Sequence, residues 1–377
     1  MFVWPVGMLC RWSQWVLWMP NLPQSKPWLA TLPPYVGGES TIRPAAARPV
    51  RLTSNEGALG SSPLAVQAFA EAAISLPLYP QANCLRLRQA IAEAHNLDPQ
   101  RIICGNGSDE FISLLTRAYA GVGDEVLYST HGFLMYKLAA LAEGAVPISV
   151  AEQGYRGDVE ALLKAVTPRT KIMFLANPNN PTGTYLTRVE ILRLLEGLPR
   201  HVLIVLDGAY AEFADAPDFD DFLKEEHDNL VVLRTFSKAY ALAGVRLGWG
   251  VFPPQVADII NRLRLPFNVN GAAQAAGIAA VQDKRHLQAT VIHNRQWRGM
   301  LSQKLEALGY PVLPSQANFI LFETGQVTKA VYEHLAAGNV FVRPVDSYGL
   351  PGHLRVTVGS AQDCQTFLDT LAEFGRV

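Results

Sequence analysis

Lys238 follows a mostly apolar run, Val231–Phe236, that is typical of a buried β-strand. A lysine is usually a solvated surface residue, but one placed at the end of a buried strand is expected to point into a cleft. Burial disfavours the charged ammonium group and so lowers the pKa of the amine. A neutral amine is the nucleophile that bonds covalently to an aldehyde. Lys238 is therefore a candidate nucleophile.

Two other predicted strands also end in polar residues. Asp207 closes the apolar run Val202–Leu206, with Tyr210 three residues later. A buried carboxylate needs a cationic or hydrogen-bonding partner, although Asp is also a common helix cap. Asn180 lies in the segment Asn177–Gly183, NPNNPTG, in which two prolines and a glycine favour a rigid loop.

A glycine-rich turn, Gly105–Glu110, lies between the predicted strand Ile102–Cys104 and a predicted helix. Glycines let the backbone approach a ligand, and a helix N-terminus offers N–H groups to a phosphate. Glu110 stands where the dinucleotide-binding motif needs a glycine, so that motif is absent. Each feature alone could be an ordinary turn, loop or cap. Together with Arg246, they suit an aldehyde cofactor that has a phosphate and a pyridine nitrogen, which describes pyridoxal phosphate.

The elements that must position these residues alternate along the chain. Between predicted strands lie predicted helices at Phe111–Ala120, with Ser108 as the N-cap, at Asp158–Val166, and at Arg188–Glu196, with a capping box from Thr187. This alternation predicts a mostly parallel α/β sheet with helices on both faces. The seven predicted strands are Ile102–Cys104, Glu125–Ser129, Val146–Val150, Lys171–Ala176, Val202–Asp207, Val231–Phe236 and Leu247–Phe252.

The C-terminal third follows a different pattern, which predicts a smaller α+β unit. Residues 271–308 form a long helical pattern, and short strands are expected at Asn318–Phe322, Val340–Arg343 and His353–Val358, with helices near 326–338 and 361–374. We therefore expect a large domain over 70–275 and a small domain over 276–377, which an N-terminal arm over 19–69 joins. Residues 1–18 are interpreted as sequence upstream of a natural start at Met19, or as a short apolar segment that packs on the body or a partner.

Composition excludes several classes of protein. The chain has 377 residues, of which 49% are hydrophobic, which excludes disorder over most of its length. A net charge of -1 provides no general attraction for nucleic acid or an anionic membrane. The four cysteines show no ligand-like spacing, so we expect no metal site and no disulfide framework, but a reducing compartment such as the cytoplasm.

A series of motifs carries a family resemblance. They are PPYVGG around Tyr35, SNEGALGSSP at 54–63, Leu78–Pro80, GNGSDE at 105–110, NPNNPTG at 177–183, Asp207–Tyr210, TFSKAYALAGVRLGW at 235–249, and Arg355. With these motifs the sequence resembles, from about residue 20 to the C-terminus, the class I/II (fold type I) aminotransferases, which use pyridoxal phosphate. It is most similar to the subgroup that acts on histidinol phosphate, although the segment after Asn55-Glu56 lacks the proline common in that subgroup.

The resemblance implies a role for each site residue. Lys238 would bind the cofactor covalently and shuttle a proton, and Asp207 would pair with the ring nitrogen. Arg355 would bind the substrate anion, with help from Arg343 and Tyr35. The other cofactor contacts would be Asn180 and Tyr210 to the ring oxygen, Phe133 on the ring face, Gly107, Ser108, Asp109, Ser237 and Arg246 at the phosphate, and Tyr79 at the phosphate of a neighbouring subunit. The last contact implies a homodimer with a shared active site.

The implied reaction is histidinol phosphate plus 2-oxoglutarate to imidazole-acetol phosphate plus glutamate, a step of histidine biosynthesis. An aromatic amino-acid aminotransferase or a threonine-phosphate decarboxylase on the same scaffold stays open at this point. Glu110 argues against a dinucleotide-dependent dehydrogenase. A transcription regulator with an aminotransferase-like body would need a basic helix-turn-helix, and residues 1–50 contain none.

Overall fold

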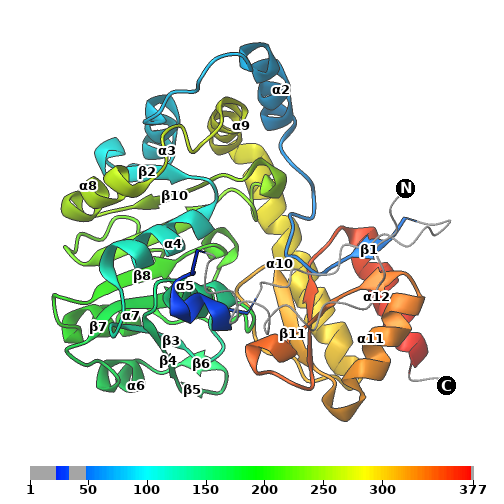
Figure 1. The fold of residues 1–377 in the computed structure, drawn as a ribbon. Coiled ribbons are helices and arrows are strands. Elements are labelled where there is room, and N and C mark those ends of the chain that lie inside the picture. Colours follow the sequence, from blue (N-terminus) through cyan, green and yellow to red (C-terminus); the bar gives the residue numbers. More distant parts are fainter. Residues whose placement is uncertain (1–22, 34–47, 375–377) are drawn as a thin grey trace.

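The structure, a computed structural model, describes residues 23–33 and 48–374. Figure 1 shows a larger body built on a wide sheet and a smaller body beside it, with the long helix α10 (Lys284–Ala307) running between them. Tyr35 and residues 1–18, for which we made predictions, lie outside the described residues.

The large sheet contains seven strands, in the order β2-β10-β9-β8-β7-β3-β4. Only β10 runs antiparallel to its neighbours, β2 and β9, so the other six strands point the same way. The prediction of a seven-stranded, mostly parallel sheet is confirmed. The strands are β2 (Ile102–Gly105), β3 (Glu125–Ser129), β4 (Val146–Val150), β7 (Thr170–Ala176), β8 (Leu203–Asp207), β9 (Leu230–Thr235) and β10 (Gly248–Val251).

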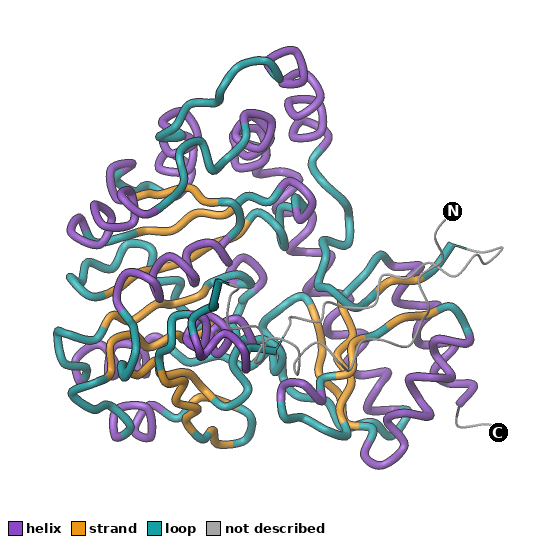
Figure 2. Tube along the Cα trace, in the orientation of Figure 1, coloured by secondary structure: helices purple, strands orange, loops and turns teal. Residues whose placement is uncertain are grey.

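Helices cover both faces of this sheet because its strands are apolar on both sides (Figure 2). In β7, Met173 packs into one hydrophobic cluster and Phe174 into the other, so successive side chains face opposite layers. One layer contains α3 (Leu85–His95), α6 (Val159–Lys164), α7 (Arg188–Gly197) and α9 (Gly271–Gln282), and the other contains α4 (Ser108–Tyr119), α5 (Leu134–Ala142) and α8 (Pro254–Leu263).

Three local predictions can be compared directly with the structure. The capping box at Thr187 and Glu190 is confirmed. The N-cap of α4 is Gly107 and not Ser108, because the chain turns there at a φ of 86°, which glycine adopts without strain. The prediction of a single long helix over 271–308 is wrong. The segment forms two helices, α9 and α10, which are divided at Asp283. The Asp283 carboxylate caps α10 by accepting a hydrogen bond from the His286 N–H at 3.1 Å.

The smaller body holds a three-stranded antiparallel sheet, β11-β14-β13. The strand predicted over Val340–Arg343 is two strands, because β12 pairs with β1 from the N-terminal segment whereas β13 pairs with β14. The bounds are β1 (Val50–Arg51), β11 (Phe319–Glu323), β12 (Val340–Phe341), β13 (Arg343–Pro344), β14 (His353–Thr357), α11 (Thr328–Ala337) and α12 (Ala361–Phe374).

Helix α2 (Pro63–Glu71) packs against α9, and β5 (Glu152–Gln153) pairs with β6 (Arg156–Gly157) in a short hairpin. The domain boundaries near residues 69 and 275 stay predictions, and they fall within α2 and α9. None of the helices in 23–33 and 48–374 has the length and apolar character that a membrane crossing requires.

Candidate active site

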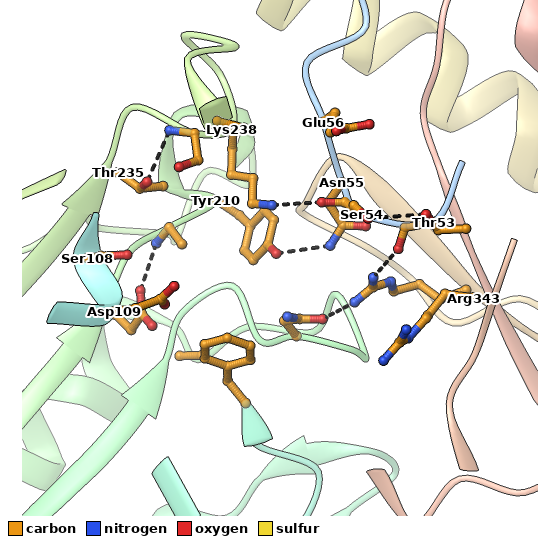
Figure 3. A pocket seen from close by; sticks show the side chains of 18 of the residues that line it. Thr53, Ser54, Asn55, Glu56, Ser108, Asp109, Tyr210, Thr235, Lys238 and Arg343 are labelled. Atoms are coloured by element: carbon orange, nitrogen blue, oxygen red, sulfur yellow. Dashed lines mark hydrogen bonds between the residues drawn. The ribbon is translucent and has the colours of Figure 1, made fainter. Parts of the chain in front are cut away.

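A cavity of about 280 Å³ lies where the carboxyl ends of the parallel strands meet the smaller body (Figure 3). Ligands bind at this edge of open α/β sheets. The large body contributes the predicted residues Ser108, Asp109, Phe133, Asn180, Asp207, Tyr210, Ser237, Lys238 and Arg246, and the smaller body contributes Arg343 and Arg355. Residues predicted from separate motifs therefore surround one space.

Lys238 lies three residues beyond the end of β9, and it lines the cavity. The amine donates a hydrogen bond to the Ser54 carbonyl at 2.8 Å and lies 5.9 Å from the centre of the Tyr210 ring (Figure 3). Burial, with the positive charge of Arg355, lowers the pKa of Lys238 to about 8. A useful fraction of this amine is neutral near physiological pH.

Asp207 is the last residue of β8 and is buried. Its Oδ1 accepts from the Ala209 N–H at 3.2 Å, and its Oδ2 accepts from the Tyr136 hydroxyl at 2.9 Å. Burial raises the pKa of Asp207 to about 6, and the Tyr136 hydrogen bond opposes that rise. The carboxylate holds a turn at its own strand end and does not cap an α-helix.

Tyr210 is buried, and its hydroxyl accepts a hydrogen bond from Asn55 Nδ2 at 2.9 Å. Asn55 is held by its own N–H, which donates to Thr357 Oγ1 at 3.0 Å in the smaller body. Asn180 lies across the cavity and accepts through Oδ1 from Arg355. The tyrosine hydroxyl and the amide therefore both face the cavity from fixed positions.

The glycine-rich turn leads into α4, whose first residues, Ser108 and Asp109, line the cavity beside Ser237 and Arg246. A Cβ at Gly107 would lie 2.6 Å from Arg246 Nη2, so only glycine leaves the guanidinium in place. Arg246 Nη1 lies 3.5 Å from Ser237 Oγ, and Nη2 lies 3.6 Å from Asp109 Oδ2. Backbone N–H groups, a hydroxyl and a guanidinium together fit a phosphate.

The two arginines of the smaller body lie opposite each other, because Arg343 in β13 pairs in register with Arg355 in β14. Arg355 Nη2 donates to the Thr53 carbonyl at 2.8 Å while Nη1 donates to Asn180. A guanidinium presents five donor hydrogens in a planar fork, which suits a carboxylate or a phosphate. Arg343 and Arg355 therefore place two positive charges on the side of the cavity that the smaller body contributes.

Phe133 and Tyr79 occupy very different places. Phe133 lines the cavity at the start of α5. Tyr79 is 84% exposed, does not line the cavity, and stacks on Phe267 with ring centres 4.6 Å apart. The predicted role of Tyr79 in a neighbouring subunit's site stays a prediction.

Several residues that line the cavity had no predicted role. Ser54, Asn55 and Glu56 lie in the SNEGALGSSP motif, which was the available signal for them, and Thr53 directly precedes that motif. Tyr348, in the turn before β14, offers no local signal because only the pairing of small-body strands brings it to the cavity.

Comparison with known proteins places the chain in a family. The family model for aminotransferase class I and II matches residues 47–371. The chain belongs to the class I and II aminotransferase family. The histidinol-phosphate aminotransferase of Paramagnetospirillum magneticum is 47% identical over 358 residues, covering 93% of this chain and 98% of that protein. The corresponding enzyme of Rhodospirillum centenum is 46% identical over 357 residues, with the same two coverages of 93% and 98%.

Solved structures agree with this family assignment. The histidinol-phosphate aminotransferase of Sinorhizobium meliloti, determined in complex with pyridoxal-5'-phosphate, superimposes with a TM-score of 0.87 at 27% identity, covering 95% of this chain and 99% of that chain. The fold class and the resemblance to the histidinol-phosphate subgroup are thereby confirmed.

Proposed function

We propose that this aminotransferase uses pyridoxal phosphate to exchange an amino group between histidinol phosphate and 2-oxoglutarate, giving imidazole-acetol phosphate and glutamate. The observation that carries the proposal is the placement of the Lys238 amine, the buried Asp207 carboxylate and two guanidinium groups around one cavity. The relatives that share almost half of the sequence support the choice of substrate.

The donor groups of the cavity fit this cofactor. Lys238 would meet its aldehyde, Asp207 its ring nitrogen, and the start of α4 with Ser237 and Arg246 its phosphate. Phe133 would cover one ring face, and Asn180 and Tyr210 would bond the ring oxygen. When bound, the cofactor supplies a conjugated ring that takes up the electron pair released at the substrate Cα.

Lys238 would move the proton. Its Nζ, with a pKa of about 8, can take a proton from the substrate Cα. It would then deliver that proton to the cofactor carbon on the other side of the substrate's amino nitrogen. The Ser54 carbonyl, 2.8 Å from Nζ, holds the amine on the side of the cavity that faces the smaller body. This anchor orients the proton carrier without adding a charge.

Arg355 would hold an anionic group of each substrate, which is the α-carboxylate of glutamate in one half-reaction and the phosphate ester of histidinol phosphate in the other. Its planar guanidinium suits either group. Arg343, opposite it in register, adds a second positive charge that suits a dianionic phosphate better than an apolar side chain. Tyr35 would assist from the N-terminal arm.

Our proposal includes a homodimer with a shared active site. Several apolar side chains close to Tyr79 in the sequence are exposed, and Ile74 is 88% exposed. Leu265, two residues before the Phe267 ring on which Tyr79 stacks, is exposed as well. Exposed apolar surface of this kind can mark protein–protein contacts. The exposed residues of this stretch are Ile74, Leu76, Leu78 and Tyr79. Sedimentation of the purified protein should give a dimer, and a fully active monomer would refute this part of the proposal.

The cytoplasm is the proposed location. The described cysteines Cys84, Cys104 and Cys364 are free and buried, as suits a reducing compartment. Fractionation of the cells that produce the protein should recover it with cytosolic markers, and recovery with an extracytoplasmic fraction would contradict the assignment.

Amino-donor profiling tests the substrate. The purified protein should absorb visible light as a bound pyridoxal enzyme, and kcat/KM should be higher for histidinol phosphate than for phenylalanine or tyrosine. If an aromatic amino acid is the better donor, the function is that of an aromatic aminotransferase. If threonine phosphate loses carbon dioxide instead, the function is that of a decarboxylase.

A further inference from the structure

Asp207 receives a hydrogen bond from a residue to which the proposed mechanism assigns no part. Tyr136 of α5 donates through its hydroxyl to Asp207 Oδ2 at 2.9 Å. The Ala209 N–H donates to the other oxygen, Oδ1, at 3.2 Å. Two donors on two different oxygens fix the rotation of the carboxylate and leave its remaining lone pairs directed toward the cavity that it lines.

Tyr136 is held rigidly. It is fully buried, its ring stacks on Phe174 with centres 4.9 Å apart and planes within 4°, and Phe133 meets it edge-on at 5.8 Å. Burial and the nearby Asp207 raise the pKa of Tyr136 well above its usual value. The hydroxyl therefore keeps its proton near neutral pH and can act as a donor.

A structural role alone explains this hydroxyl poorly. A phenylalanine would fill the same apolar space without the cost of burying a polar group. The hydroxyl meets an ionisable group, where a hydrogen bond is worth about twice one between neutral groups.

The other groups that face Asp207 act in opposite directions. Asp109 of α4 and the burial of the site favour the protonated acid, whereas Lys238 and the Ala209 N–H favour the carboxylate. Tyr136 adds to the second set. It therefore opposes the protonation that burial promotes.

We infer that Tyr136 is a positioning residue for Asp207: its hydroxyl holds the carboxylate ionised and oriented to accept a hydrogen bond from the protonated ring nitrogen of pyridoxal phosphate. The inference rests on the proposed function, since it assumes that Asp207 meets that nitrogen. Tyr136 touches the reaction only through Asp207.

The test is cofactor affinity, measured by titrating the apoprotein with pyridoxal phosphate and following protein fluorescence. Tyr136→Phe removes one oxygen atom from a packed ring and should raise the dissociation constant about tenfold or more, the loss expected for one hydrogen bond to a charged group. The kcat should fall while the KM of the amino donor changes little. Tyr128→Phe is the matched control, because Tyr128 is a buried tyrosine of the same hydrophobic cluster, and it should bind cofactor like the wild type.

A double-mutant cycle separates positioning from packing. In an Asp207→Ala background, Tyr136→Phe should add little to the loss of cofactor affinity, because the acceptor is already gone. An equal fold-loss in both backgrounds, or a dissociation constant for Tyr136→Phe within about twofold of the wild type, would overturn the inference. If the wild-type apoprotein itself fails to bind pyridoxal phosphate, the proposed function fails instead.

Discussion

Replacing Lys238 by methionine should abolish turnover and yet stabilise the apoprotein. The pKa of Lys238 falls from its usual 10.5 to about 8 in the folded chain, mainly because the amine is buried. At 1.36 kcal/mol per pKa unit, holding the charged amine in the cavity costs about 3 kcal/mol below pH 8. Lys238→Met removes this cost and so stabilises the folded chain, but it also loses the hydrogen bond to the Ser54 carbonyl, which offsets about 1 kcal/mol of the stabilisation. We expect a net gain of about 2 kcal/mol at pH 7.

The sign of the pH dependence follows from linkage. Because the folded-state pKa lies below the unfolded value, the folded chain binds fewer protons than the unfolded chain between pH 8 and 10.5. The cost is therefore fully present below pH 8 and disappears as the pH rises toward 10.5. The advantage of Lys238→Met should shrink accordingly between pH 7 and pH 10.

Urea unfolding of the two apoproteins at pH 7 and at pH 10 measures this difference directly. Lys304→Met is the control, since Lys304 is an exposed residue of α10, and it should change stability little at either pH. A Lys238→Met apoprotein that is no more stable than the wild type at pH 7 would refute the argument that burying the charged Lys238 amine destabilises the folded chain.

The remaining predictions concern the cofactor and the substrate. Asp207→Asn should keep the fold but lower kcat about a thousandfold, because removing the carboxylate from its proposed ion pair with the cofactor's ring nitrogen costs about 3–5 kcal/mol. Near-normal turnover would mean that Asp207 only holds its turn. Arg355→Ala should lower kcat/KM for both glutamate and histidinol phosphate, whereas Arg343→Ala should lower the two unequally; equal losses would argue against separate roles. Gly107→Ala should weaken cofactor binding, since its Cβ would lie 2.6 Å from Arg246 Nη2 and φ there is +86°; an unchanged dissociation constant would contradict that contact. Tyr79→Phe should weaken cofactor binding several-fold, for about 1 kcal/mol, if Tyr79 reaches the partner's site; unaltered binding would argue against a shared site.

Local pattern predicted the large sheet well. Continuous apolar runs such as Val202–Asp207 can be stable only where both faces are covered, so each of the seven runs became a strand of one sheet. The same patterns failed at element ends. Whether Gly107 or Ser108 caps α4, and where the helical pattern over 271–308 breaks, depends on single backbone angles and caps that periodicity does not encode.

The sequence by itself determined the chemistry available to this protein: an amine, a carboxylate and a phosphate-type turn, each at the end of a predicted strand, because residue type and strand ends are local properties. Tertiary structure decided which groups those residues meet. The hydroxyl of Tyr136 reaches Asp207 across 71 positions of sequence, and Asn55 reaches Tyr210 across 155. Such pairings follow from how layers pack and how the N-terminal segment joins the smaller body. The lowered pKa of Lys238 has the same origin, because burial by distant segments produces it and no feature of the neighbouring sequence does.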